Sequence, residues 1–233
     1  MGKQCCKNIK MNNFFIYSDQ NLEIYLKHKR FCVKEDKSGY KKISNIENVK
    51  FNITDKMTAI YQIINYGSFT TKSWQILLQN NPSDYFYNNY IRDKKISGTH
   101  FCHDTNIHRG HYIGSQLAKF LIPKNILYNE KVRNNDINLF FGKGNPINIY
   151  YQTRTANCNS NTANGQLYFE KDIIEFLSAK NSDGKTFEGR KIFYEIEDIF
   201  FDEKSIGRKL TIKKCENNIQ KECESHHVFI PNI

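Results

Sequence analysis

The sequence lacks the features that mark membrane-spanning proteins and zinc fingers. No run of apolar residues approaches the roughly 20 that a membrane-spanning helix needs. The first segment has no apolar signal-peptide core, because Lys7, Lys10, Asn12 and Asn13 interrupt it. The seven cysteines are odd in number and form no Cys-x-x-Cys pair of the zinc-binding type. We therefore expect no membrane-spanning helix, no signal peptide and no zinc finger.

Internal repeats, proline-rich linkers and low-complexity tracts are also missing. In contrast, 39% of the 233 residues are hydrophobic and 14% are aromatic, which is enough material for a full core. We expect one folded domain over residues 81–233. Residues 1–80 carry no motif and are expected to be an N-terminal extension or accessory segment of unknown role, with an edge hairpin as one option.

Positive charge is in excess, with 34 Lys and Arg against 24 Asp and Glu and a formal net charge of +10. A basic surface favours polyanions such as nucleic acid or an anionic membrane. Lys, Asn, Ile, Tyr and Phe are abundant together, however, as in chains encoded by AT-biased genomes. The charge therefore supports nucleic-acid binding without establishing it.

The N-terminal residues resemble an acylation signal. Gly2 follows a removable methionine, as in myristoylated chains, and Cys5 and Cys6 are candidates for palmitoylation. Two acyl chains beside lysines suffice for stable attachment to a membrane surface. Cys6 stands where the motif has Ser or Thr, so an ordinary frayed N-terminus is the alternative. We expect a cytoplasmic chain, or a membrane-anchored one if these residues are acylated.

Hydrophobic periodicity predicts helices and strands without regular alternation. Helices are expected at residues 55–65, 115–121 and 167–177. Strands are expected at residues 85–91, 99–102, 147–153, 191–196, 199–201, 209–212 and 227–230. This mixture indicates the α+β class, with a mixed or antiparallel sheet and packed helices.

The segment His108-Arg109-Gly110-His111 contains residue types suited to phosphodiester hydrolysis. The reaction requires a water molecule, a base that takes its proton, and positive charge at the phosphate. Histidine suits the base because its reference pKa of about 6.5 leaves it mostly neutral at pH 7. Arginine grips phosphate oxygens as a fork, and a hard cation such as Mg²⁺ needs only one or two protein oxygens.

Later segments complete a pattern. Asn148 and Asn157 lie nine residues apart, and Glu170 follows in Tyr-Phe-Glu. Together with Arg109-Gly110-His111, this ordered set resembles the DNA/RNA non-specific endonuclease family, the ββα-metal or His-Me finger nucleases, and in particular its bacterial DNA-entry nucleases and secreted DNases. That family has Asp-Arg-Gly-His, a hydrophobic helix, two asparagines at this spacing and a later glutamate. The resemblance covers about residues 85–230.

The resemblance implies a ββα-metal finger active site and gives roles to its residues. His111 would be the general base, and Asn157 would bind the metal directly. Asn148 would position the base or the metal site, and Glu170 would act on a metal-bound water. Each has an ordinary alternative, since asparagines often occupy turns and a glutamate at a helix start complements the helix dipole.

The same resemblance implies that Arg109 and Arg154 contact phosphate near the scissile bond. The implied cofactor is Mg²⁺, with Mn²⁺ able to substitute, and the implied substrate is DNA, with RNA as a second candidate. An inhibitor protein is a further candidate partner, as for a toxin or effector nuclease. The sequence gives no indication of oligomeric state.

One residue departs from the family pattern, because His108 stands where the family has Asp. Loss of this negative charge would weaken metal affinity or shift the preferred metal or pH, unless Asp104 compensates. The alternative function is a catalytically impaired nucleic-acid-binding or membrane-associated protein that keeps the nuclease fold. A zinc cluster of His100, His103, His108 and His111 is disfavoured by its irregular spacing.

Overall fold

Most of the molecule is built on one large antiparallel sheet. The computed structural model describes residues 14–94, 106–142, 145–159, 163–217, 219–221 and 224–233. Seven strands hydrogen-bond in the order β1-β2-β10-β8-β7-β4-β3, and β9 pairs with β8. Their bounds are β1 Val33–Lys37, β2 Tyr40–Ile43, β3 Ala59–Tyr66, β4 Phe69–Gln79, β7 Arg190–Phe201, β8 Lys204–Glu216, β9 Ile219–Gln220 and β10 His226–Pro231.

A second, smaller sheet pairs β5 (Ile107–His111) with β6 (Ile149–Thr153), also antiparallel. The α-helices are α1 Asp19–His28, α2 Lys124–Leu127, α3 Glu130–Val132, α4 Asn138–Gly142, α5 Arg154–Asn157 and α6 Gln166–Ser178. Tighter or wider helical turns are η2 Ile46–Asn48, η3 Tyr87–Ile91, η4 Ser115–Phe120 and η5 Arg133–Ile137. The α+β class with an antiparallel sheet and packed helices is confirmed.

Tight hairpins set the register of the long central strands. Asp202 and Glu203 link β7 to β8 with φ of +47° and +63°, the left-handed pair that matches the twist of adjoining strands. Gly67, with φ +59°, begins the turn between β3 and β4. The β4–β7–β8 core of the sheet is therefore fixed by local turns as well as by its apolar side chains.

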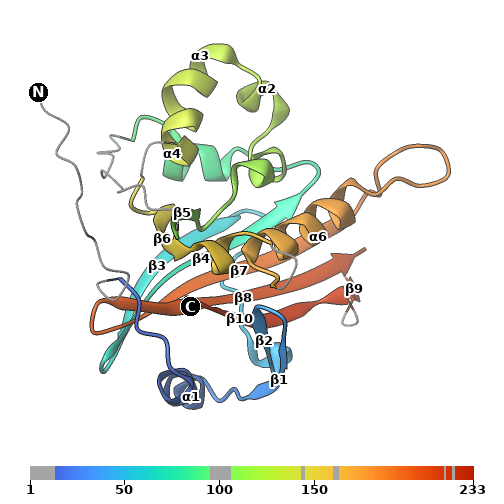
Figure 1. Cartoon of the computed structure of the whole chain (residues 1–233). Helices are drawn as coiled ribbons and strands as arrows, with labels where there is room; N and C mark the ends of the chain where they lie inside the picture. The colour runs from blue at the N-terminus through green and yellow to red at the C-terminus, as the bar shows by residue number, and fades with distance from the viewer. Residues whose placement is uncertain (1–13, 95–105, 143–144, 160–162, 218, 222–223) are drawn as a thin grey trace, which may run out of the picture.

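The two faces of the large sheet carry different layers (Figure 1). The main core lies on the face covered by α6, η4 and the β5–β6 pair, around Trp74, Tyr194 and Leu210. α1 covers the other face with Leu22 and Leu26, which belong to a smaller cluster. Side chains alternate along a strand, so neighbouring residues of β8 serve opposite layers.

Several expected elements are confirmed. α6, β8 and β10 cover the elements predicted at 167–177, 209–212 and 227–230, and the strands predicted at 191–196 and 199–201 form the single strand β7. β6 covers the strand predicted at 147–153 except for its first two residues. β5 is followed by η4, so the histidine segment does lie at a strand-to-helix junction. Within residues 1–80, β1 and β2 form an edge hairpin, and β3 and β4 are strands of the large sheet.

Two predictions were wrong. The helix expected at 55–65 is largely strand β3, whose eight residues pair in register with β4. The strand expected at 85–91 is helical, because Phe86 and Tyr90 lie four residues apart and both pack on Trp74, with ring centroids 5.8 and 4.8 Å away. The strand predicted at 99–102 lies outside the described residues. No helix in the described part of the chain is long and apolar enough to cross a membrane.

Candidate active site

Strand β5 and the short helix α5 carry most of the predicted site residues, and β6 connects the two. β5 and β6 pair so that His108 faces Gln152 and His111 faces Ile149 across the ladder. α5 begins directly after β6, and the Thr153 hydroxyl caps it by accepting from the N–H of Ala156 at 3.3 Å. This connection brings residues from both ends of the predicted motif to one place.

Gly110 permits a close approach behind the strand. A Cβ at this position would lie 2.7 Å from Cβ of Gln152 and 3.1 Å from Nη1 of Arg208. Any larger side chain would therefore displace the packed groups that support β5. The glycine between Arg109 and His111 is required by packing.

Nε2 of His111 holds the imidazole in place. Nε2 lies 2.5 Å from the carbonyl oxygen of Phe141, which can only accept, so Nε2 carries the proton and donates. The described residues give Nδ1 no hydrogen-bond partner. Burial, with smaller contributions from Arg208 and Arg109, holds the pKa of His111 below its ordinary value. His111 is thus a neutral, oriented imidazole with Nδ1 available to accept a proton.

Arg208 of β8 supports the backbone on which His111 stands. Its guanidinium donates from Nη2 to the carbonyl of Gly110 at 3.1 Å and from Nη1 to the carbonyl of His111 at 2.8 Å. The side chain is fully buried. A planar guanidinium with fixed donors can hold two successive carbonyls in a way that a lysine cannot.

Three further side chains accept from Arg208. Nη1 also contacts Oε1 of Gln152 at 3.0 Å and Oε1 of Gln166 at 2.8 Å, and Nε faces Oδ2 of Asp198 at 3.5 Å. A buried charge is tolerated only with such partners. The network joins β5, β6, β8 and α6 behind His111.

Glu170 belongs to this buried network. It is only 5% exposed, and its carboxylate accepts from Gln116 at 2.8 Å and from Gln166 at 2.9 Å. Gln166 in turn donates to the carbonyl of His111 at 2.7 Å. Burial raises the pKa of Glu170 despite these donors. The structure therefore connects Glu170 to His111 through Gln166.

Asn148 is fully buried and binds the segment that follows His111. Its Oδ1 accepts from the N–H of Ile113 at 2.9 Å, and Nδ2 donates to the carbonyls of Ile113 and Phe140 at 3.3 and 3.5 Å. Phe140 precedes the residue whose carbonyl holds His111. Asn148 thus fixes both sides of the His111 contact and is not exposed to a ligand.

Asn157 lies beside His108. Its Nδ2 is 3.3 Å from Nδ1 of His108, and Sγ of Cys158 is 3.5 Å from the same nitrogen. All three residues are partly exposed. Burial and then the charge of Arg154 hold the pKa of His108 below its ordinary value. His108, which stands where the family pattern has Asp, therefore contacts Asn157, the predicted metal ligand.

Arg109 and Arg154 are both exposed. Their charges reach the site, since Arg109 lowers the pKa of His111 and Arg154 that of His108. Exposed guanidiniums near these two imidazoles can bind phosphate oxygens from solution.

The site thus has two layers. His108, Asn157 and the two arginines lie at the surface, whereas Asn148 and Glu170 are buried and support His111 from behind. Sequence reasoning missed Arg208, Gln166 and Gln152 as supports. The available indication was Arg208 itself, a cation at the same alternating positions of β8 as the core residues Leu210 and Ile212.

Other predicted features lie elsewhere. Gly2, Cys5 and Cys6, and likewise His100, His103 and Asp104, lie outside the described residues.

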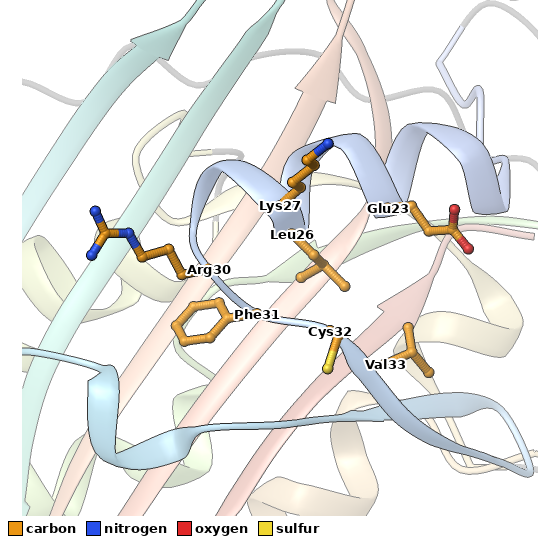
Figure 2. A pocket seen from close by; sticks show the side chains of 7 residues that line it. All are labelled: Glu23, Leu26, Lys27, Arg30, Phe31, Cys32 and Val33. Carbon is orange, nitrogen blue, oxygen red and sulfur yellow. The ribbon is translucent and has the colours of Figure 1, made fainter.

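A surface pocket of about 440 Å³ contains no predicted site residue and lies at the end of α1 and the segment leading into β1 (Figure 2). It is lined by Glu23, Leu26, Lys27, Arg30, Phe31, Cys32 and Val33.

No protein-family model, curated protein or solved structure matches this chain. The interpretation of the site depends on its own geometry and on the motif residues themselves.

Proposed function

We propose that the chain is a metal-dependent, sequence-nonspecific endonuclease that hydrolyses phosphodiester bonds of DNA, and of RNA as a second substrate. The observation that carries the proposal is the hydrogen bond that Nε2 of His111 donates to the carbonyl of Phe141, with no partner for Nδ1 among the described residues. That hydrogen bond assigns the proton-accepting role to Nδ1, as a general base requires. The β5–β6 pair followed by α5 also supports the proposal, because a ββα-metal finger consists of two strands and then a helix.

In the proposed reaction Nδ1 of His111 takes a proton from the attacking water. Arg109 and Arg154 bind non-bridging phosphate oxygens and orient the scissile bond. Asn148, Gln166 and Glu170 act through position, because they are buried. Since these contacts address the phosphate, which carries no sequence information, cleavage would be nonspecific.

The half-exposed Asn157 is the residue that would hold the metal ion. A Mg²⁺ ion keeps several waters and needs few protein oxygens, and an amide oxygen is a suitable hard ligand. When bound, such an ion stabilises the charge that develops on the phosphate and the leaving oxygen. Mn²⁺ is expected to substitute because it accepts the same oxygen ligands.

Plasmid cleavage tests the proposal. Wild-type protein in Mg²⁺ is expected to relax and then degrade the plasmid, and EDTA or the Asn157→Ala substitution is expected to abolish this. The Ser73→Ala variant, changed on β4 away from the site, is a matched control that should cleave normally. Protein that is folded, loaded with Mg²⁺ and inert on both DNA and RNA would refute the proposal.

A second candidate function is favoured by one observation, the contact between His108 and Asn157. If this imidazole impairs metal binding, the protein would bind nucleic acid without cutting it. A wild type that shifts DNA in a gel but does not cleave, together with a cleaving His108→Asp variant, would establish that alternative.

A further inference from the structure

The three side chains at the outer edge of the site form a compact triangle of donor atoms. Nδ1 of His108 is 3.3 Å from the amide of Asn157 and 3.5 Å from Sγ of Cys158. The third side, from the Asn157 amide to Sγ of Cys158, measures 3.7 Å. The triangle therefore combines one imidazole nitrogen, one amide and one thiol.

We propose that His108, Asn157 and Cys158 form a binding site for a borderline or soft divalent cation of the Zn²⁺ class. Zn²⁺ binds histidine nitrogen at about 2.0–2.1 Å and cysteine sulfur at about 2.3 Å. Two such ligands at the tetrahedral angle lie about 3.4–3.6 Å apart. The three measured sides lie within about 0.2 Å of that range, so one ion can bind all three with little movement.

The donor chemistry favours Zn²⁺ over Mg²⁺. Imidazole nitrogen and thiolate sulfur suit zinc, whereas magnesium prefers oxygen ligands. The amide nitrogen of Asn157 faces His108, and a half-turn of the amide presents its oxygen instead. No group of three His, Cys, Asp or Glu side chains arranged for a metal occurs in the described part of the chain, so the amide supplies the third ligand here. The fourth position is left for water or a phosphate oxygen, as in open zinc sites.

A Zn²⁺ ion at this site would affect the proposed nuclease, because both metal ions would use Asn157 as a ligand. In part this inference rests on the proposed nuclease, because Asn157 would serve both Mg²⁺ and Zn²⁺. Occupation by Zn²⁺ would then exclude Mg²⁺ from Asn157. We expect about one equivalent of Zn²⁺ to inhibit Mg²⁺-dependent cleavage, and Cys158→Ser to relieve the inhibition.

Cobalt substitution tests the site without reference to cleavage. Co²⁺ is added to reduced full-length protein, and the thiolate-to-cobalt charge-transfer absorption is recorded. Wild type is expected to show this band at about one equivalent, and Cys158→Ser is expected to lose it. Cys32→Ser removes an exposed thiol that hydrogen-bonds to Ser44, and this variant should keep the band. His108→Asp is expected to weaken Co²⁺ binding at least about tenfold.

The outcomes separate this inference from the proposed function. A cobalt band that depends on Cys158, in a protein that cuts no nucleic acid, supports the metal site and contradicts the nuclease. Cleavage in Mg²⁺ without any such band overturns the metal site and leaves the nuclease standing. A band that survives in Cys158→Ser also overturns the site.

Discussion

At the scale of single residues, His111 combines a held imidazole with a lowered pKa. Burial disfavours the imidazolium, and Arg208 and Arg109 disfavour it further. A general base must be neutral to act, so its useful range extends to lower pH as its pKa falls. The acid limb of the pH profile for kcat/KM is therefore expected below about pH 6.5, which is the ordinary pKa of histidine. Arg109→Ala is expected to move the limb upward, and a limb at or above the ordinary value in wild type would contradict the assignment.

Arg208 gives a second prediction at this scale. Arg208→Lys keeps the charge but cannot hold both the Gly110 and His111 carbonyls, so the imidazole is displaced. A small misplacement of a catalytic group costs up to about 10²-fold in rate. We expect kcat to fall by about that factor with KM little changed. Arg190→Lys, which alters an arginine paired with Glu216, is the matched control. Equal kcat in the Arg208 variant and in wild type would exclude the positioning role.

At the scale of elements, Asn148, directly before β6, joins the segment after β5 to α4. Asn148→Ala leaves the Ile113 N–H and two carbonyls without these partners in a buried place. Each unsatisfied buried group costs about 1–3 kcal/mol. Urea denaturation is expected to show a loss of this size or larger. Asn80→Ala, which removes a half-buried amide bonded to the Leu177 carbonyl, should cost less. A loss no greater than in this control would contradict the account.

His227 of β10, which contacts the carbonyl of Ser44 directly after β2, predicts a pH dependence of stability. Burial lowers the pKa of His227 to about 3, with Lys209 as the next cause. The unfolded chain takes up the proton near pH 6.5, so it binds more protons than the folded chain below that pH. The free energy of unfolding should therefore fall by up to about 1.4 kcal/mol per pH unit from this group as pH drops from about 6.5 toward 3. His227→Gln should flatten the decline between pH 6.5 and 5.5 in urea titrations. An unchanged slope in that variant would refute the linkage.

Elements were predictable from the sequence where the spacing of apolar residues and their residue types indicated the same structure. α6 has Phe169, Ile173 and Leu177 on one face, and β7 is rich in β-branched and aromatic residues, so both were predictable. β3 was missed because Ile60, Ile63 and Ile64 satisfy the helical spacing as well as strand propensity, and only pairing with β4 decides. β4 is the next strand in the sequence, but the apolar spacing within one segment gives no information about its pairing with another.

The site likewise contains residues that a sequence motif indicates and residues that only the fold brings together. The motif residues could be named from the sequence, because the resemblance concerns short segments that are contiguous in sequence. Arg208 is 97 residues from His111, and an arginine in a strand is normally exposed. Only the packing of β8 beneath β5 turns it inward. The contact of Cys158 with His108, 50 residues apart, also depends on the fold.

At the scale of the whole molecule, a net charge of +10 predicts salt-sensitive binding to nucleic acid. The His111→Ala protein, which is expected to be deficient in cleavage, allows the affinity for DNA to be measured without hydrolysis. Arg109→Ala and Arg154→Ala in that background should each reduce the slope of log Kd against log salt by about 1. Arg30→Ala removes an exposed arginine two residues after α1, and α1 covers the face of the large sheet away from the site (Figure 1), so this variant should change the slope little. Equal changes in all three variants would show that binding is a general effect of charge.

The most direct test of the central claim is the single-turnover rate of DNA cleavage in Mg²⁺ by wild type and by His111→Ala. Both proteins are first shown to be folded by their urea transitions. The account predicts cleavage by wild type and a rate lower by about 10²–10⁴-fold in the variant, the usual contribution of a positioned general base. A variant that cuts as fast as wild type would contradict the role of His111.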